Sequence, residues 1–215
     1  MFDVETIPDR LAIFPLTGAL LLPKGALPLN IFEPRYLAML DDTLKTDHRM
    51  IGMIQPRAEN AAGLEDLHPV GCMGRITSFN ETPDGRYQIS LTGITRFRLT
   101  GVESGFHPYL LADVDRSEFA EDLEKPVPDE GFDRPKFLDL LMRYFETENL
   151  QSDWENLREA DEALMIDALS MLCPFEAEEK QLLLEAADLA ARRSALQTLM
   201  EFAIRKTEEG EGRVQ

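Results

Sequence analysis

Histidine and cysteine are the residue types in this chain best suited to bind a metal, and their spacing does not support that role. The three histidines, His48, His68 and His107, lie far apart in loop-like sequence. The two cysteines, Cys72 and Cys173, are about a hundred residues apart, so they form neither a ligand pair nor a disulfide framework. No H-E-x-x-H or C-x-x-C motif occurs. The sequence therefore predicts no metal site and no cofactor.

Motifs of hydrolytic and nucleotide chemistry are also missing. Ser90 and Ser170 have no base at a suggestive spacing, and there is no G-x-S-x-G motif. Neither a G-x-x-x-x-G-K-[ST] phosphate loop nor a glycine-rich dinucleotide fingerprint is present. Catalytic groups can assemble from distant positions, so missing motifs do not exclude an enzyme. Without these motifs, however, the sequence offers no residue to which a catalytic role can be assigned, and we expect no catalytic activity.

The net charge of the chain indicates which classes of partner are disfavoured. It has 22 basic and 40 acidic residues and a net charge of −18, most of it in the C-terminal half. A surface this negative repels phosphate backbones and disfavours nucleic acid as a partner. The same acidity is also explained by solubility alone.

Features that direct a chain to a membrane or to secretion are not apparent. No stretch approaches 18 consecutive apolar residues, so no transmembrane helix is expected. The N-terminal residues 1–6 include acids where a signal peptide needs bases. With only two distant cysteines, these features predict a cytoplasmic protein without a membrane partner.

Leu20, Leu21 and Leu22 are the first candidate binding residues. They lie in a connection between two expected strands, where loops are normally polar and exposed. Such an apolar run either packs beneath the strands or forms an apolar surface patch. The sequence leaves both alternatives open.

The segment Phe32-Glu33-Pro34-Arg35-Tyr36 is the second candidate. Pro34 suits the first turn of a helix, so Glu33 would lie near a helix N-terminus, where a negative charge is favourable. Arg35 could then pair locally or across the strands. This structural explanation competes with a binding role for Phe32, Glu33, Arg35 and Tyr36.

Periodicity divides the chain into a strand-rich part and a helix-rich part. Residues 11–116 contain several short apolar or alternating runs typical of strands, with one early helix at about 34–46. We assign residues 1–116 to the first unit and the acidic, proline-bearing residues 117–131 to a linker. Residues 132–207 carry apolar stripes of helical period and predict a helical bundle. The charged residues 208–215 are expected to form a disordered tail.

Motifs along the whole chain resemble one known family. Residues 11–36 contain the string "FPL…LLP-x-G…LPL-x-IFEPRY", and residues 70–76 read "VG-x-x-x-x-I". Further on are "DGRY…L-x-G-x-x-RFR" from residue 84, "PY-x-x-A-x-V" from residue 108 and "EKQ-x-LLE" from residue 179. This order and spacing resemble the N-terminal substrate-binding domain of the Lon (La) ATP-dependent protease family, from about residue 8 to about residue 205. No room remains for an ATPase or peptidase domain, so the chain resembles a stand-alone Lon domain.

The resemblance implies an α+β fold with an N-terminal PUA-like β-barrel followed by a C-terminal α-helical bundle. It also implies a non-catalytic module that binds unfolded or damaged polypeptides in protein quality control, with a protease or chaperone acting in trans. The candidate peptide-binding residues chosen above from the sequence are Leu20, Leu21, Leu22, Phe32, Glu33, Arg35 and Tyr36. The alternatives are RNA binding, since PUA-like barrels elsewhere bind RNA, and a hydrolase. RNA binding would require Arg75, Arg86, Arg96 and Arg98 to form one basic patch.

Overall fold

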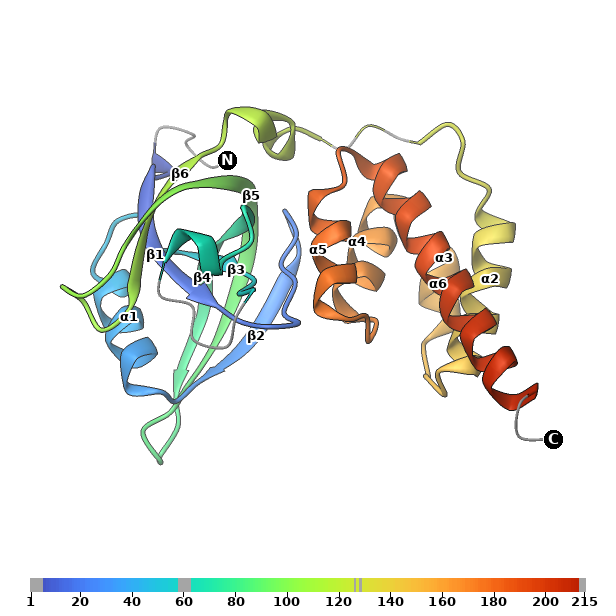
Figure 1. Cartoon of the computed structure of the whole chain (residues 1–215), viewed down its shortest axis with the longest axis horizontal. Coiled ribbons are helices and arrows are strands. Elements are labelled where there is room, and N and C mark those ends of the chain that lie inside the picture. The colour runs from blue at the N-terminus through green and yellow to red at the C-terminus, as the bar shows by residue number, and fades with distance from the viewer. Residues whose placement is uncertain (1–5, 58–62, 126, 128, 213–215) are drawn as a thin grey trace. The chain divides into compact units, whose positions relative to one another are not determined.

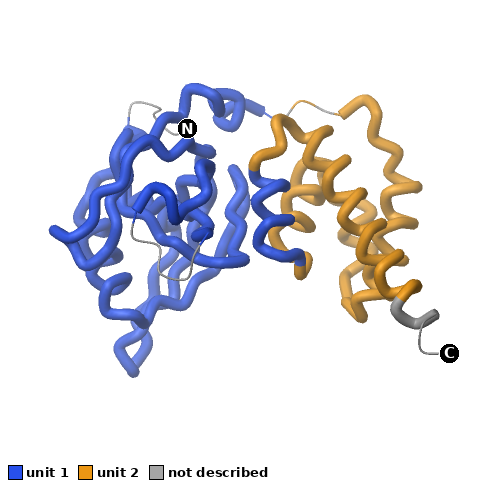
Figure 2. The backbone as a smooth tube through the Cα atoms, viewed as in Figure 1, with its two compact units in different colours: residues 1–125, 175–184 blue, residues 126–174, 185–215 orange. Residues whose placement is uncertain are grey.

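The structure is a computed structural model that describes residues 6–57, 63–125, 127 and 129–212. It contains two compact units (Figures 1 and 2). The first comprises residues 1–125 and 175–184, and the second comprises residues 126–174 and 185–215. The chain therefore passes between the units three times, rather than once through the linker expected at 117–131.

A six-stranded mixed sheet forms the first unit, in the order β2-β5-β4-β3-β1-β6. Its strands are β1 (Arg10–Pro15), β2 (Ala26–Ile31), β3 (Met50–Ile54), β4 (Val70–Glu81), β5 (Tyr87–Glu103) and β6 (Leu110–Asp115). The β1–β3 pair is parallel and the other pairs are antiparallel.

Strand β5 closes the sheet because it is long enough to pair with β2 near one end and with β6 near the other. Residues 87–92 of this strand pair with β2, and residues 98–103 pair with β6, which also pairs with β1. The sheet thus closes through five strands, while β2 stays outside the ring as an edge strand. The expected α+β class is confirmed, although the barrel is irregular because β2 does not take part in its closure.

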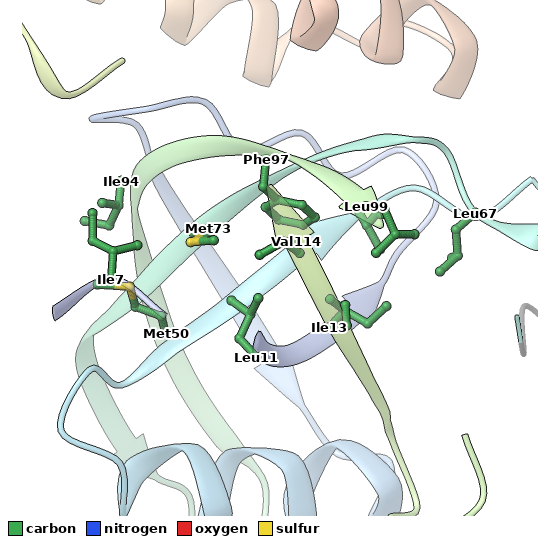
Figure 3. Close-up of a cluster of buried hydrophobic side chains, with 12 residues drawn as sticks. Ile7, Leu11, Ile13, Met50, Leu67, Met73, Ile94, Phe97, Leu99 and Val114 are labelled. Atoms are coloured by element: carbon green, nitrogen blue, oxygen red, sulfur yellow. The ribbon is translucent and has the colours of Figure 1, made fainter. Parts of the chain in front are cut away.

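Apolar side chains from the five strands of the ring meet inside it (Figure 3). Phe97 has no solvent exposure and belongs to this cluster together with Ile13, Met50 and Met73. Side chains buried this completely are the main source of folding free energy. Helix α1 (Pro34–Leu44) follows β2 directly and buries Tyr36, Met39 and Leu40.

The segment expected to begin a linker is part of the first unit. Residues Ser117–Leu123 form the short 3-10 helix η3, with Phe119 buried. Asp122 accepts hydrogen bonds from the guanidinium and the backbone N–H of Arg96, and both side chains are over 90% buried. The acidic composition was misleading because one acid pairs with a buried arginine of β5.

Helix α5 (Ala177–Glu185) also belongs largely to the first unit, although we expected residues 132–207 to form one bundle. Its Gln181 donates from Nε2 to the Val70 carbonyl at 3.1 Å, and Gln55 Nε2 donates to the Ala177 carbonyl at 2.8 Å. Lys180 Nζ donates to the Gly18 carbonyl at 2.9 Å. The partners of these polar groups, Val70, Gln55 and Gly18, all belong to the first unit, which explains the reassignment.

The second unit contains α2 (Arg134–Thr147), α3 (Trp154–Glu159), α4 (Glu162–Leu172) and α6 (Leu189–Gly212). Asp133, Asp153 and Asp161 cap the first three of these helices, each accepting from a backbone N–H three residues on. Phe137 and Leu141 of α2 are fully buried. Helix α6 continues to Gly212, so residues 208–212 are helical rather than disordered, and residues 213–215 lie outside the described part.

Candidate functional site

The first unit contains a cavity of about 540 Å³ beside β2. Three chain segments line it: residues 14–17 at the end of β1, residues 28–33 with Arg35 and Tyr36 from β2 into α1, and residues 104–105 and 107–110 between β5 and β6. Pro56 completes the lining. This volume lies within the usual range for ligand-binding pockets.

Buried aromatic rings form part of the cavity lining. Phe14 and Tyr36 have ring centroids 4.2 Å apart, and the rings of His107 and Tyr109 stack at 5.1 Å. Phe14, Tyr36 and Tyr109 are each less than 10% exposed. Rings held in place by such packing offer an apolar surface that need not reorganise when a ligand binds.

The charged groups of the cavity neutralise each other. Arg35 pairs with Glu33 at 2.9 Å, and its guanidinium also lies 4.6 Å from the centre of the Tyr36 ring. Glu33 is the N-cap residue of α1, but its side chain makes no capping hydrogen bond. The sequence left local and cross-strand pairing of Arg35 open, and the structure has the local pair.

The two tyrosines of the cavity remain neutral at physiological pH. Burial raises the pKa of Tyr36. Burial, together with a 2.9 Å hydrogen bond donated to Asp42, raises the pKa of Tyr109 to about 12. The same hydrogen bond lowers the pKa of Asp42. Both phenols therefore act as apolar rings with a polar edge.

Two exposed aromatic residues, Phe32 and Phe106, belong to the chain segments that form this cavity. Phe32, which lines it, is 59% exposed, and Phe106, in the connection that supplies His107 and Tyr109, is 86% exposed. The Arg86 guanidinium lies 5.9 Å from the centre of the Phe32 ring. Large apolar side chains exposed beside an aromatic cavity are typical of interaction sites.

Four of the seven candidate residues line this cavity: Phe32, Glu33, Arg35 and Tyr36. The other three, Leu20, Leu21 and Leu22, are at most 2% exposed, so they form no surface patch. They lie against glycines of the sheet: a Cβ at Gly74 would come 2.7 Å from Leu21 Cδ2, and one at Gly93 would come 2.0 Å from the Leu22 carbonyl oxygen. The missing side chains at these glycines make room for the loop.

Sequence reasoning missed the lining residues from the connection 104–110 and from the end of β1. The connection contains Gly105-Phe106-His107-Pro108-Tyr109, three aromatic residues beside a glycine and a proline. In the sequence, Pro108-Tyr109 drew attention only as part of the motif "PY-x-x-A-x-V". Exposed aromatic residues in a turn between strands were the available signal.

Three of the four arginines required for RNA binding are engaged with carboxylates. Arg86 pairs with Asp84 at 3.0 Å, and Arg98 pairs with Glu118 at 2.6 Å. Arg96 is buried against Asp122. These three arginines do not provide the basic patch that the RNA alternative needs.

The described residues contain no group of three or more His, Cys, Asp or Glu side chains arranged to hold a metal ion. Within the same residues, no helix is both long and apolar enough to cross a membrane.

Comparisons with known proteins give relatives along almost the whole chain. Lon protease 2 of Myxococcus xanthus is 28% identical over 218 aligned positions, which cover 97% of this chain and 25% of the relative. Lon protease of Syntrophus aciditrophicus is 26% identical over 86% of this chain and 24% of the relative. The chain thus spans about a quarter of the length of these relatives.

Solved structures give the same fold. The N-terminal domain of Mycobacterium avium complex Lon protease superposes with a TM-score of 0.62 at 16% identity, covering 89% of this chain and 98% of that one. A Lon N-terminal domain protein from Xanthomonas campestris gives 0.58 at 23% identity, covering 89% and 97%. The family model of the ATP-dependent protease La (LON) substrate-binding domain matches residues 10–201. This chain therefore belongs to the LON substrate-binding domain family.

Proposed function

We propose that this chain is a non-catalytic module that binds exposed apolar segments of unfolded or damaged polypeptides through the cavity beside β2. It would act in protein quality control in the cytoplasm and pass its clients to a protease or chaperone in trans. The family supports substrate recognition as the general role. The full-length relatives are proteases, and their activity is not assumed for this chain.

One observation carries the proposal: an exposed aromatic side chain lies at the rim of a preformed aromatic cavity. Phe32 is 59% exposed, whereas Phe14 and Tyr36 beside it are buried and packed together. A client side chain that entered the cavity would bury its own surface and part of Phe32. Burial of one large apolar side chain is worth about 1.5–3 kcal/mol.

The electrostatics of the cavity favour uncharged segments. Glu33 and Arg35 cancel each other at the lining, while the whole chain carries a charge of −18. The core segments of an unfolded protein are apolar and poor in charge. They would bind here without leaving a buried charge unpaired.

The test uses a fluorescent probe peptide of about ten residues in which Val, Leu and Phe alternate with Ser and Thr. A control peptide has every apolar residue replaced by Ser. Fluorescence anisotropy should show binding of the probe peptide and much weaker binding of the control peptide. Phe32→Ser should weaken binding about 10- to 100-fold, which corresponds to the loss of one buried apolar contact.

The chain contains a matched control for this substitution. Phe202 of α6, in the second unit, is 60% exposed, almost the same as Phe32. Phe202→Ser removes a side chain of equal size and exposure and should leave binding unchanged. Equal loss in both variants would indicate nonspecific apolar adhesion, and unchanged binding in Phe32→Ser would remove the cavity as the site.

A further inference from the structure

The backbone of β2 is an open sheet edge. Within the described residues, β2 pairs with β5 alone, through the register from Ala26↔Thr92 to Ile31↔Tyr87. Gly93 N–H donates to the Gly25 carbonyl at 2.8 Å, and antiparallel ladders alternate between residues that face the partner and residues that face away. The backbone groups of Ala26, Pro28 and Asn30 therefore face the outer edge.

The position of Pro28 agrees with this alternation. Proline has no N–H and is tolerated in a sheet where that group would face away from the neighbouring strand. Ala26, Pro28 and Asn30 are all exposed, whereas Leu27, Leu29 and Ile31 are half-buried or buried. The outer edge thus offers two N–H donors, from Ala26 and Asn30, and three carbonyl acceptors.

This edge has little of the protection that sheet edges normally carry. Natural edge strands are commonly protected by charged side chains, bulges or covering segments. Strand β2 has the sequence ALPLNI, with no charge, in a chain of which 29% is charged. Its ladder with β5 runs over six successive pairs without a register shift. Pro28 is the single protective residue.

The edge also borders the cavity. Five consecutive residues, from Pro28 to Phe32, line it. Successive side chains of a strand point to opposite faces, so a run of consecutive lining residues means that the strand presents its edge to the cavity. An occupant of the cavity would therefore have unpaired backbone groups of β2 within its reach.

We propose that the client binds in extended conformation, adding a strand to the free edge of β2 and inserting an apolar side chain into the cavity. This inference rests on the proposed function and specifies its ligand: a segment with free backbone N–H groups, able to become a β-strand and uncharged where it meets the Glu33–Arg35 pair. Main-chain hydrogen bonds give such a site tolerance for sequence, and the cavity selects for apolar side chains. Both properties suit a module that binds many clients.

The decisive test uses the wild-type protein with two N-methylated versions of the probe peptide. Each version carries methyl groups on one of the two alternating sets of amides. An added strand turns one set toward β2 and the other toward solvent, so one version should bind at least about 10-fold more weakly while the other binds within about 3-fold of the parent. Equal affinity of both versions and the parent, or equal loss in both, would overturn strand addition.

A substitution tests the same point from the protein side. Asn30→Pro removes an outward N–H without removing a group that faces β5, and Asn30→Ala keeps that N–H. Binding of the parent peptide should be at least about 10-fold weaker in Asn30→Pro than in Asn30→Ala, because the two variants lose the same side chain and differ in the outward N–H. Unchanged binding in Asn30→Pro would contradict the inference.

Three further outcomes separate the competing explanations. If Phe32→Ser weakens binding but N-methylation and Asn30→Pro do not, strand addition fails and the proposed function stands. If the wild-type chain binds no probe peptide, the proposed function itself fails. A dimer of the wild-type chain in sedimentation that Asn30→Pro dissociates would show that β2 pairs with a second copy of itself, which would overturn a client as the occupant.

Discussion

Two apolar stretches of the first unit lie in opposite environments: the leucine loop, which is Leu20, Leu21 and Leu22, and Phe32 just after β2. Leu20, Leu21 and Leu22 are at most 2% exposed, whereas Phe32, ten residues further on, is 59% exposed. The leucines lie on Gly74 and Gly93, and the Gly18 carbonyl beside them accepts a hydrogen bond from Lys180 of α5. Phe32 follows an edge strand that pairs with β5 alone among the described residues. Backbone surroundings, rather than local composition, decide which stretch is available for binding.

The comparison can be tested first with the buried leucines. Leu22→Ala should lower the free energy of unfolding by about 2–5 kcal/mol, because it leaves a cavity at a fully buried position. Urea denaturation measures this change, with Leu182→Ala, at a 55% exposed site, as the control of small effect. A loss below about 1 kcal/mol would mean that the leucine loop is not packed as described.

Loss of a contact between α5 and the rest of the first unit should have the next largest effect on the free energy of unfolding. Gln181→Ala leaves the Val70 carbonyl without this amide and removes one of the two acceptors of Gln55 Nε2, at a cost of about 1–3 kcal/mol. Hydrogen exchange should increase in residues 16–25 and stay unchanged in residues 28–36. Glu178→Gln, at an 81% exposed side chain of the same helix, serves as the control. An equal change of exchange in residues 16–25 and in residues 28–36 would contradict the distinction between the two segments.

Tyr109 tests the cavity by titration. Its pKa of about 12 exceeds the ordinary phenol value, so the folded state favours the neutral form. This contribution to stability is complete below about pH 10 and is lost as the pH rises towards 12. Tyr109→Phe should remove the phenol component near pH 12 from the absorbance titration and raise the pKa of Asp42. A Tyr109 phenol that ionises near pH 10 would contradict the buried hydrogen bond.

Phe32 should give the smallest change in stability. Phe32→Ser removes an exposed side chain and should alter the free energy of unfolding by no more than about 0.5 kcal/mol. The same denaturation experiment then compares it directly with Leu22→Ala. A loss of about 2 kcal/mol or more would show that Phe32 supports the fold, and reduced peptide binding in this variant would no longer identify a site.

Periodicity and composition predicted the two kinds of unit and much of the element order, because alternation and helical stripes are local properties of the sequence. Two assignments failed for non-local reasons. The acidic segment 117–125 folds onto β5 because Asp122 meets the buried Arg96, and α5 leaves the bundle because Gln181 reaches Val70. The pairs are 26 and 111 residues apart in the chain. No local pattern marks such partners.

The candidate site was predicted in part. The segment from Phe32 to Tyr36 lines the cavity, but its other wall comes from Ser104–Leu110, which only the closure of β6 onto β1 and β5 brings close. The glycines at 74 and 93 were visible in the sequence. Their meaning, space for Leu21 and Leu22, required the three-dimensional arrangement.

Hydrogen exchange of the whole chain, with and without excess probe peptide, tests the central claim most directly. We predict that the peptide slows exchange in two segments, residues 26–36 and residues 104–110, and that the Ala26 and Asn30 amides show the largest protection within β2. Hydrogen exchange in the leucine loop should not change when the peptide is added. Protection confined to the second unit, for example at α4, where Leu164 and Leu172 are 62% and 80% exposed, would contradict the account.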